Sequence, residues 1–366
     1  MASDEMWGHP LTCSYRVMAV DRATGHEVRR LPSVSGGSIS RNLDTDTFES
    51  ATLTLRGPAG EAPDLVRVWL DATDQLTGEE TSEPLGTFLV SMPKREVDGR
   101  TESTTADLYG RLRELADDDF DVPFPVAAGS DAVAVAAGIA RGCGLEVVAD
   151  PSDFRTTAEW TFGVGGGGDD SPDTKLKAIN KLLDVAGFSA ARTDTYGRVL
   201  MRRYPKPQSR RPVRVFREGP GCAVERQITD ELDRMAVSNV VHVDYVTQDV
   251  TVRGTAVDDD PNSEWSTVSV GRRIVKRYEY QDLPEGTTAD AAQATANLRA
   301  AELLSSERSV LRRVTLTCAY CPVAVEDAIT VDIPTAGVSR DYVVRTQDID
   351  LGAMCAMKIE ARNFGR

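Results

Sequence analysis

Short runs in which apolar and polar residues alternate dominate the first third of the chain. Residues 15–20 and 52–56 have the alternation of half-buried strands, and the glycine pair at 36–37 and the Gly-Pro pair at 57–58 separate such runs as turn residues do. Further runs of strand length lie at residues 65–70, 86–92 and 101–108. Many short strands with frequent turn signals predict a β-sandwich or β-barrel over residues 1–115.

A helical period replaces the alternation at about Asp117. Ser130 is the predicted N-cap of a first helix, and Ser171, followed by proline, is the predicted start of a second one. Their predicted buried faces are Ala132, Val135, Ala136, Ile139 and Ala140 in the first helix and Leu176, Ile179, Leu183 and Ala186 in the second. A hairpin with its turn at residues 195–197 follows, so residues 116–208 are expected to form a small α+β unit.

Runs of strand length return after residue 208. They are rich in Val, Ile, Thr and Tyr and lie at residues 239–245, 249–253, 268–270, 314–319, 328–332, 341–346 and 354–361. A helix near residues 289–309 interrupts them, with a predicted apolar face of Ala291, Ala294, Leu298, Ala301 and Leu304. We therefore expect residues 209–366 to form a second β domain that carries this helix and a small insertion.

The acidic balance of the chain argues against a protein that grips nucleic acid. The 366 residues include 57 Asp and Glu against 42 Lys and Arg, which gives a net charge of −15. Such a charge repels a polyanion, although DNA can still slide past an acidic surface without sticking. A hydrophobic content of 41% supports a globular chain, and a chain of this length favours two to three compact units.

Neither a secretion signal nor a membrane segment is expected. The N-terminus is acidic and polar, and the most apolar stretch, residues 132–140, is too short to span a bilayer. Six cysteines are too sparse for a disulfide-stapled secreted scaffold. We expect synthesis in a reducing cytoplasm, with all six thiols free and no bound metal.

Two motifs resemble parts of ligand sites but lack the rest of the site. The glycine run 165–168 precedes the second predicted helix, as in phosphate loops, yet Asp169 and Asp170 would repel a phosphate. Cys318 and Cys321 have the spacing of half a zinc site. No second pair follows, and in a predicted strand these thiols would point to opposite faces.

Acidic residues and histidines give no clear site either. Asp44 and Asp46 resemble the start of a calcium loop without its later ligands, and residues 258–260 are three aspartates that are typical of a solvated loop. There is no Gly-x-Ser-x-Gly elbow, and His9, His26 and His242 form no recognisable triad. We predict that the chain is not an enzyme and assign no catalytic, cofactor-binding or metal-binding residue.

The order of several segments resembles a known family. Residues 85–90, the charged turn at Asp98 and Gly99, and residues 106–112 resemble the end of the first barrel in baseplate hub proteins, the tail-tip hubs of long-tailed bacteriophages. The later segments that fit are the helix at 175–183, residues 228–233, residues 238–243, Asp327, residues 342–344, Gly352 and Met357.

This resemblance implies a mainly β fold of two similar β-barrels, residues 1–115 and part of 209–366, joined by the α+β unit. It implies a homotrimer whose barrels form a pseudo-sixfold ring. Such a ring joins the hexameric tail tube to a threefold tip in the virion and encloses the DNA channel without binding DNA specifically. The implied partners are the distal tail protein, the tail tube and tape-measure proteins, and tip or fibre proteins.

Charge adds an expectation about that channel. Lys or Arg in the lumen would hold passing phosphates, so we expect acidic or neutral side chains from both barrels to line it. The basic residues of the linker from Arg202 to Arg211 are then expected to contact neighbouring subunits.

Two alternative functions stay open. A carbohydrate-binding module at the tail tip would need exposed aromatic residues, but aromatics make up 6% of the chain and Trp7, Trp69, Trp160 and Trp265 are dispersed. A cell-wall hydrolase would need a pocket in which carboxylates converge. Because the hub pattern runs to Arg366, we expect receptor recognition and cell-wall cleavage to belong to other chains.

Overall fold

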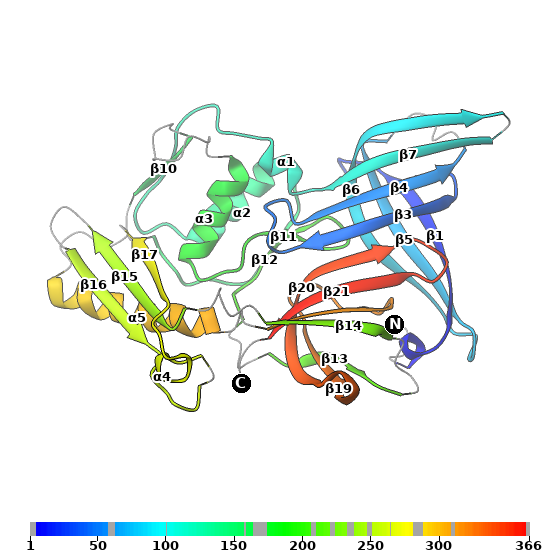
Figure 1. Ribbon diagram of the computed structural model, residues 1–366. Helices are drawn as coiled ribbons and strands as arrows, with labels where there is room; N and C mark the ends of the chain where they lie inside the picture. The colour runs from blue at the N-terminus through cyan, green and yellow to red at the C-terminus, as the bar shows by residue number, and fades with distance from the viewer. Residues whose placement is uncertain are drawn as a thin grey trace.

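The chain is mainly β, and most of its strands belong to one large sheet (Figure 1). The computed structural model describes residues 5–57, 63–99, 101–156, 159–163, 174–205, 210–219, 224–232, 238–246, 251–263, 265–280, 288–308 and 312–363. Two β regions lie side by side in this sheet, while two smaller units that contain the helices lie beside them (Figure 1).

The first β region follows the alternation of the sequence. Its strands are β1 (Leu11–Val20), β2 (Glu27–Arg30), β3 (Val34–Asn42), β4 (Glu49–Arg56), β5 (Leu65–Asp74), β6 (Glu80–Asp98) and β7 (Thr101–Gly110). Each predicted strand of this region is confirmed. The glycine pair at 36–37 was predicted as a turn, which is wrong: it lies inside β3, where the pairing with β4 shifts register. Close approach of β4 explains Gly37, because a Cβ there would lie 2.2 Å from the Thr52 carbonyl oxygen.

The second β region continues the same sheet. Its strands are β13 (Pro212–Arg217), β14 (Val224–Leu232), β18 (Arg312–Ala319), β19 (Ala328–Ile333), β20 (Val338–Asp350) and β21 (Ala356–Asn363). β20 pairs antiparallel with β3, with Asp348 opposite Ser40 and Ile349 opposite Ile39. The two β regions are therefore joined edge to edge by backbone hydrogen bonds.

The described strands of this sheet pair along a path from β14 to β2 that does not close on itself. The prediction of a mainly β fold is confirmed, and the prediction of two barrels stays a prediction. No helix in the described part of the chain combines the length and the apolar character needed to cross a membrane.

The α+β unit contains the two helices that the sequence predicted. Its elements are α1 (Arg113–Ala116), β8 (Phe124–Val126), α2 (Ala132–Gly142), β9 (Val147–Ala149), β10 (Trp160–Phe162), α3 (Lys175–Val185), β11 (Arg192–Thr193) and β12 (Val199–Met201). The cap of α2 was predicted at Ser130 but is Asp131, whose carboxylate accepts from the Ala134 amide. Thr174 caps α3, and Ser171 lies outside the described residues. The hairpin between β11 and β12 is confirmed.

A separate unit, the β15–α5 unit, interrupts the second β region. It consists of β15 (Val240–Val246), β16 (Thr251–Val257), α4 (Thr267–Val270), β17 (Val275–Tyr280) and α5 (Ala289–Arg308). The predicted strand at 268–270 is wrong, because Ser266 caps a helical turn there that Gly271 ends in the left-handed region. The small core of this unit consists of Val241, Val243, Tyr245, Ala296, Ala300 and Leu304.

The buried face of α5 differs from the predicted one. Ala292, Ala296, Ala300 and Leu304 are buried, whereas Leu298 is 65% exposed. The predicted face was wrong for Ala291, Ala294, Leu298 and Ala301, which are all exposed. Alanines of α5 lie on several sides of this helix, so the position of the sheet decides which of them are buried. Gly254 of β16 lies so close to α5 that a Cβ there would be 2.1 Å from the Ala296 carbonyl carbon.

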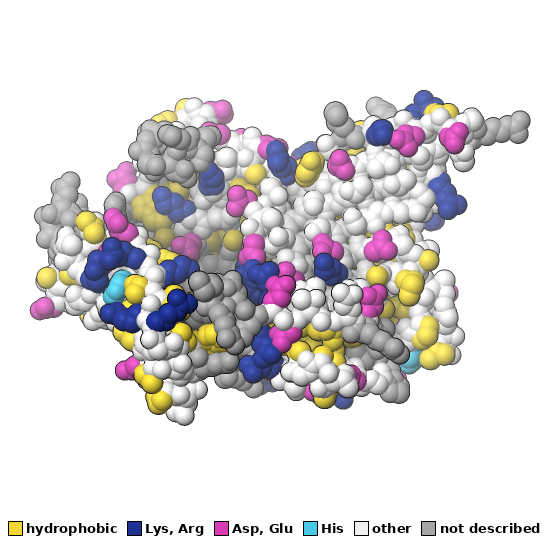
Figure 2. All heavy atoms as spheres, viewed as in Figure 1, with side chains coloured by type: hydrophobic (Ala, Val, Ile, Leu, Met, Phe, Trp, Pro, Cys, Tyr) yellow, Lys and Arg dark blue, Asp and Glu magenta, His cyan; other side chains and the backbone are white. Residues whose placement is uncertain are grey.

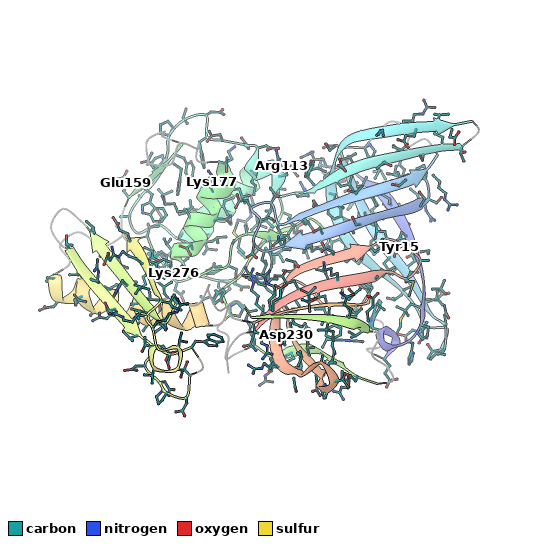
Figure 3. The ribbon with its side chains drawn as sticks, in the orientation of Figure 1. Tyr15, Arg113, Glu159, Lys177, Asp230 and Lys276 are labelled. Atoms are coloured by element: carbon teal, nitrogen blue, oxygen red, sulfur yellow. The ribbon has the colours of Figure 1, made fainter. Side chains whose placement is uncertain are left out.

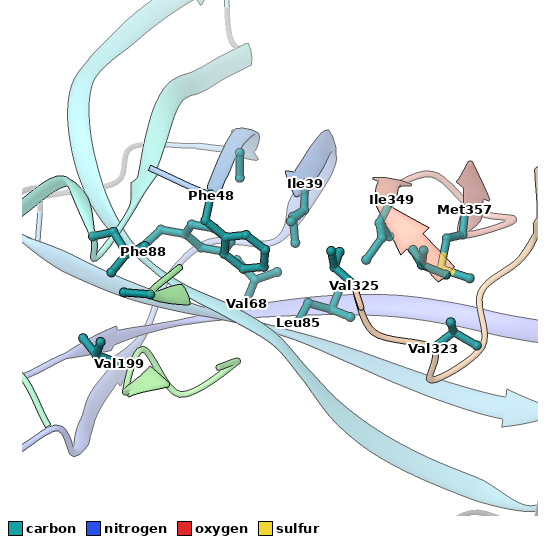
Figure 4. Packing of buried hydrophobic residues seen from close by; sticks show 14 of the residues in the cluster. Ile39, Phe48, Val68, Leu85, Phe88, Val199, Val323, Val325, Ile349 and Met357 are labelled. Atoms are coloured by element: carbon teal, nitrogen blue, oxygen red, sulfur yellow. The ribbon is translucent and has the colours of Figure 1, made fainter. Parts of the chain in front are cut away.

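One continuous core joins the two β regions and the α+β unit (Figure 4). Phe48 and Phe88 come from the first β region, Ile349 and Met357 from the second, and Val199 from β12. These five side chains are at most 5% exposed. The relative positions of the three parts therefore depend on shared packing, whereas the β15–α5 unit has a core of its own.

The close approach of β16 and α5 predicts the effect of one methyl group. Gly254→Ala should destabilise the β15–α5 unit by about 1–3 kcal/mol, because the new Cβ meets backbone atoms that have no room to move. Gly138→Ala in α2 is the matched control, since no atom lies within 4 Å of its new Cβ and alanine favours a helix by about 0.5–1 kcal/mol. Hydrogen exchange of the α5 amides and urea unfolding measure both changes. Equal protection of α5 in the two variants would show that the packing has been misread.

Candidate assembly site

The guanidinium of Arg41 lies where the first and second β regions meet. Its Nε donates to Glu49 Oε2 at 3.3 Å, its Nη1 donates to Gln347 Oε1 at 2.8 Å, and its Nη2 donates to the Leu85 carbonyl oxygen. Arg41 comes from β3, Glu49 from β4 and Gln347 from β20. One cation, whose side chain is 11% exposed, thus binds strands on both sides of the β3–β20 pairing.

The acidic partner of this cation also contacts the α+β unit. Glu49 is 3% exposed, and the Thr193 hydroxyl of β11 donates to its Oε1 at 2.5 Å. Gly110 leaves room for the carboxylate, since a Cβ there would lie 2.4 Å from Glu49 Cγ. Burial raises the pKa of Glu49, although Arg41 and Thr193 act to lower it. The first β region, the second β region and the α+β unit, together called the main body, therefore meet at this one ion pair.

A second ionic contact joins the α+β unit to the second β region. Arg192 of β11 forms an ion pair with Glu326, and Arg210 Nη1 donates to the Glu326 carbonyl oxygen at 2.6 Å. Glu326 has a positive φ of 73°. Asp327 beside it is partly buried, which raises its pKa, while Arg192 and Arg210 act to lower it. These groups hold the turn before β19 against the α+β unit.

The basic linker contributes to contacts within the chain. Arg202 Nη1 donates to Asp150 at 2.6 Å, and Arg203 Nη2 donates to the Pro151 carbonyl oxygen at 2.6 Å. Arg210 is 9% exposed. Residues 206–209 lie outside the described part of the chain. The expectation that this linker contacts neighbouring subunits stays a prediction, with several of its cations already engaged inside the chain.

The turn of the β11–β12 hairpin docks on the outer face of the first β region. Thr87 donates its hydroxyl to the Thr195 carbonyl oxygen at 3.0 Å, and Arg67 Nε donates to the Thr87 hydroxyl at 3.0 Å. The rings of Trp69 and Tyr196 meet edge to face at 6.4 Å. This contact is a further attachment of the α+β unit to the strands.

The two thiols of the predicted half zinc site are both buried and lie together. The prediction that Cys318 and Cys321 point to opposite faces is wrong, because β18 ends at Ala319 and the chain turns before the second thiol. The hydrogen bond from Cys318 lowers the pKa of Cys321, and burial opposes it. In the described residues, no three His, Cys, Asp or Glu side chains are grouped as metal ligands would be.

The other candidate residues take part in local structure. Asp44 accepts from Arg345 and Arg362, the latter at 2.7 Å. Asp258 is buried and accepts the Ser263 hydroxyl at 2.6 Å. Both aspartates therefore already have partners from the chain. The glycine run 165–168, with Asp169 and Asp170, lies outside the described residues.

The histidines lie on different elements. His9 Nδ1 is hydrogen-bonded to the buried Asp74 at 2.7 Å, His26 is exposed beside β2, and His242 is hydrogen-bonded to Thr255 at 2.9 Å. Burial acts to raise the pKa of Asp74, but His9, Thr77 and the Leu76 amide outweigh it and lower that pKa. The structure does not bring the three histidines together.

The tryptophans are also apart from one another. Trp7 is 3% exposed and packs on Tyr320, while Trp160 packs on Phe162. The face of Trp69 is covered by the Arg16 guanidinium, 4.6 Å from the ring centre. Trp265 belongs to the turn before α4 in the β15–α5 unit. These four rings do not form a common platform for a sugar.

The open face of the β15–α5 sheet carries a group of cations. Figure 2 shows Lys and Arg side chains gathered around a histidine on this side of the molecule. Arg253, Arg273 and Arg277 lower the pKa of His242, after the larger effect of burial. Asp244 accepts from Arg253 Nη2 at 2.8 Å and lies 3.6 Å from Arg277 Nε. The face is therefore basic with an internal counter-charge.

Exposed valines border these cations on the same face. Val240 lies opposite Val257 on one side and Val275 on the other, and the two flanking valines are 44% and 49% exposed. Val240 itself is buried, so the exposed apolar part of this face consists of Val257 and Val275. Exposed apolar side chains beside paired charges are a composition found at contact surfaces between proteins. Sequence analysis missed this face, because β17 had not been predicted and no local signal places three strands side by side.

The architecture is similar to that of solved tail proteins. No protein-family model and no curated protein matches the sequence. The tail protein from Neisseria meningitidis MC58 matches with a TM-score of 0.67 at 12% identity over 97% of both chains. The 43 kDa tail protein of prophage MuSo2 from Shewanella oneidensis matches with a TM-score of 0.63 at 12% identity, over 95% of this chain and 98% of that one.

The chain has the fold of these tail proteins. The prophage tail protein gp18 from Listeria monocytogenes EGD-e matches as well, with a TM-score of 0.54 at 12% identity over 96% of this chain and 94% of that one. The resemblance inferred from the sequence is thus confirmed at the level of the fold. These matches span nearly the whole chain, so they include the β15–α5 unit as well as the two β regions.

The contacts of Arg41 predict that this residue contributes strongly to the stability of the folded chain. Arg41→Met should cost about 3–5 kcal/mol, because it leaves the buried Glu49 carboxylate without its cation. Arg113→Met is the matched control: this arginine is 47% exposed, pairs with Asp117 on the surface, and should cost less than about 1 kcal/mol (Figure 3). Urea unfolding measures the loss in free energy of unfolding for each of the two variants. A double variant with Glu49→Gln should recover part of the loss, and similar costs for the two arginines would contradict a central role for Arg41.

The same ion pair predicts a pH dependence. The folded-state pKa of Glu49 lies above its ordinary value of 4.5, so above that pH the folded chain binds more protons than the unfolded chain. Its contribution to stability is therefore lost as the pH rises through the folded pKa. Glu49→Gln should make the urea midpoint fall less with rising pH than in the wild type. The pKa of Asp74 is lowered from its ordinary value of 3.8, so its contribution to stability is lost as the pH falls below that value. This contribution is the same in the wild type and in Glu49→Gln, so it does not affect the comparison. Parallel pH profiles would show that Glu49 does not titrate in this way.

Proposed function

We propose that this chain is a structural subunit of a phage-type tail, the hub that joins the hexameric tail tube to a threefold tip. The observation that carries the proposal is the architecture: two β regions joined edge to edge by β3 and β20, an arrangement that matches tail proteins along nearly their whole length. A structural role in an assembly is consistent with a chain in which the ion pair of Arg41 and Glu49 joins the two β regions and the α+β unit.

Symmetry matching follows from two β regions in one chain. Three copies place six β regions around an axis, so one face of the ring fits a sixfold tube while the chain itself repeats three times. The proposal treats each β region as one barrel of the ring. The continuous core and the Arg41 junction support it, since a ring that carries load needs β regions that do not move relative to one another.

The ring encloses the DNA channel in this proposal. A net charge of −15 favours passage of DNA without specific binding, because it repels the phosphates. Side chains from the two β regions, acidic or neutral in character, line the lumen. Distal tail, tail tube, tape-measure and tip or fibre proteins are the proposed partners, and the tail tip of the virion is the proposed location.

The exposed face of the β15–α5 sheet belongs to the outside of the ring in this account. Its arginines around His242 would hold DNA if they faced the lumen. The exposed side chains of Val257 and Val275 beside these arginines suit a contact with another protein.

The copy number tests the hub proposal. Native mass spectrometry of the purified chain and electron cryomicroscopy of the assembled tail should give three copies, or a multiple of three, arranged around the channel. A map in which the two β regions do not surround the channel, or in which Lys and Arg dominate its wall, contradicts the proposal. Zymography on peptidoglycan and binding to host cell wall separate it from the hydrolase and carbohydrate-binding alternatives, which require cleavage or retention.

A further inference from the structure

Two cysteines from opposite ends of the chain meet at a second contact between the β regions. Cys13 lies on β1, paired with Ala72 of β5, and Cys355 lies in the turn between β20 and β21. The Tyr15 hydroxyl, two residues along the same face of β1, donates to the Gly352 carbonyl oxygen at 2.8 Å (Figure 3). This face of β1 therefore lies directly against the β20–β21 turn.

The backbone fixes the direction of the Cys355 side chain. Its amide donates to the Gly352 carbonyl oxygen at 3.1 Å, and its own carbonyl oxygen accepts from the Tyr320 amide at 2.9 Å. Cys355 has a positive φ of 44°, a conformation that is strained for a residue with a side chain. The turn that contains Gly352 and Cys355 is held against β1 by Tyr15, which places the Cys355 thiol near enough to the Cys13 thiol for each to shift the pKa of the other.

The pair differs from the other cysteines in the described residues. Cys13 is half-buried and so has access to solvent, whereas Cys318 and Cys321 are both buried. The Cys143 thiol is half-buried too, but its contact is with the Asp118 carboxylate at 3.5 Å. Cys13 and Cys355 therefore combine an accessible thiol with a fixed second thiol beside it.

We propose that Cys13 and Cys355 are a redox-modification site that reacts with a small-molecule disulfide, such as oxidised glutathione, and closes into an intramolecular disulfide. The Cys13 thiolate attacks one sulfur of glutathione disulfide and releases one glutathione thiolate, which takes up a proton. Cys355 then loses its proton and attacks the Cys13 sulfur, which releases the second glutathione. Two protein thiols are oxidised, and one glutathione disulfide is reduced to two glutathione thiols.

The order of attack follows from the surroundings of the two thiols. The hydrogen bond from Cys355 lowers the pKa of Cys13, against a smaller effect of burial, while the same contact and burial raise the pKa of Cys355. Cys13 is therefore the attacking sulfur and Cys355 the resolving one. The bond would link β1 to the β20–β21 turn and close a loop of nearly the whole chain, the case in which a cross-link removes most entropy from the unfolded state.

The test uses the full chain, first reduced and then treated with oxidised glutathione, with remaining thiols blocked by N-ethylmaleimide. Trypsin separates the cysteines well: Cys13 falls in residues 1–16, Cys355 in 346–358 and Cys143 in 142–155. Mass spectrometry without reduction should find residues 1–16 linked to 346–358, with the loss of two hydrogens. The oxidised chain should melt about 5 °C or more above the reduced chain, and reductant should reverse the shift.

Cys13→Ser and Cys355→Ser should each lose the cross-link and the melting shift, and Cys143→Ser should keep both. Recovery of Cys13 as a stable glutathione adduct or as a maleimide adduct, in a sample where Cys143 carries glutathione, would overturn the proposal. A cross-link without a melting shift would refute the lock between the β regions. Because the wild type is compared in its two redox states, these outcomes do not depend on whether a serine variant folds.

Discussion

The placement of Arg41 is the constraint on which the rest of the structure depends. A buried guanidinium has to satisfy its donors inside the protein, and here its acceptors come from β4, β6 and β20. The carboxylate that balances its charge takes a further hydrogen bond from β11. A shift of the first β region, the second β region or the α+β unit would leave a charged group without a partner, so all three are held in one arrangement.

Packing and backbone pairing act in the same direction as this ion pair. β3 and β20 continue one sheet across the boundary, and the core beneath them is shared by both β regions and by β12. The β15–α5 unit is attached differently, since it has a small core and a sheet of its own. The molecule thus consists of a firmly joined body with a separate unit that can present a surface without disturbing that body.

Charge is distributed in keeping with this division. Many arginines of the main body are engaged in ion pairs with acidic residues of other segments, such as Arg345 and Arg362 with Asp44. The cations around His242 lie instead on the open face of the β15–α5 sheet. Arg253 and Arg277 share Asp244 as a counter-charge, and in the proposed ring their face lies on the outside, because Lys and Arg beside the channel would hold passing phosphates.

The sequence by itself determined β1, β4, β5, β6 and β7 of the first β region, the helices α2 and α3 and the β11–β12 hairpin, because periods of two and 3.6 residues act over a few neighbours. The tertiary structure decided the rest. The alanines of α5 lie on several sides of the helix, so the sheet beneath it determines that Ala296 is buried and Leu298 is exposed. Arg41, Glu49 and Gln347 carry no local signal of their meeting, and neither do Cys13 and Cys355. Such contacts arise between residues far apart in sequence, where the packing of whole units fixes which side chains meet.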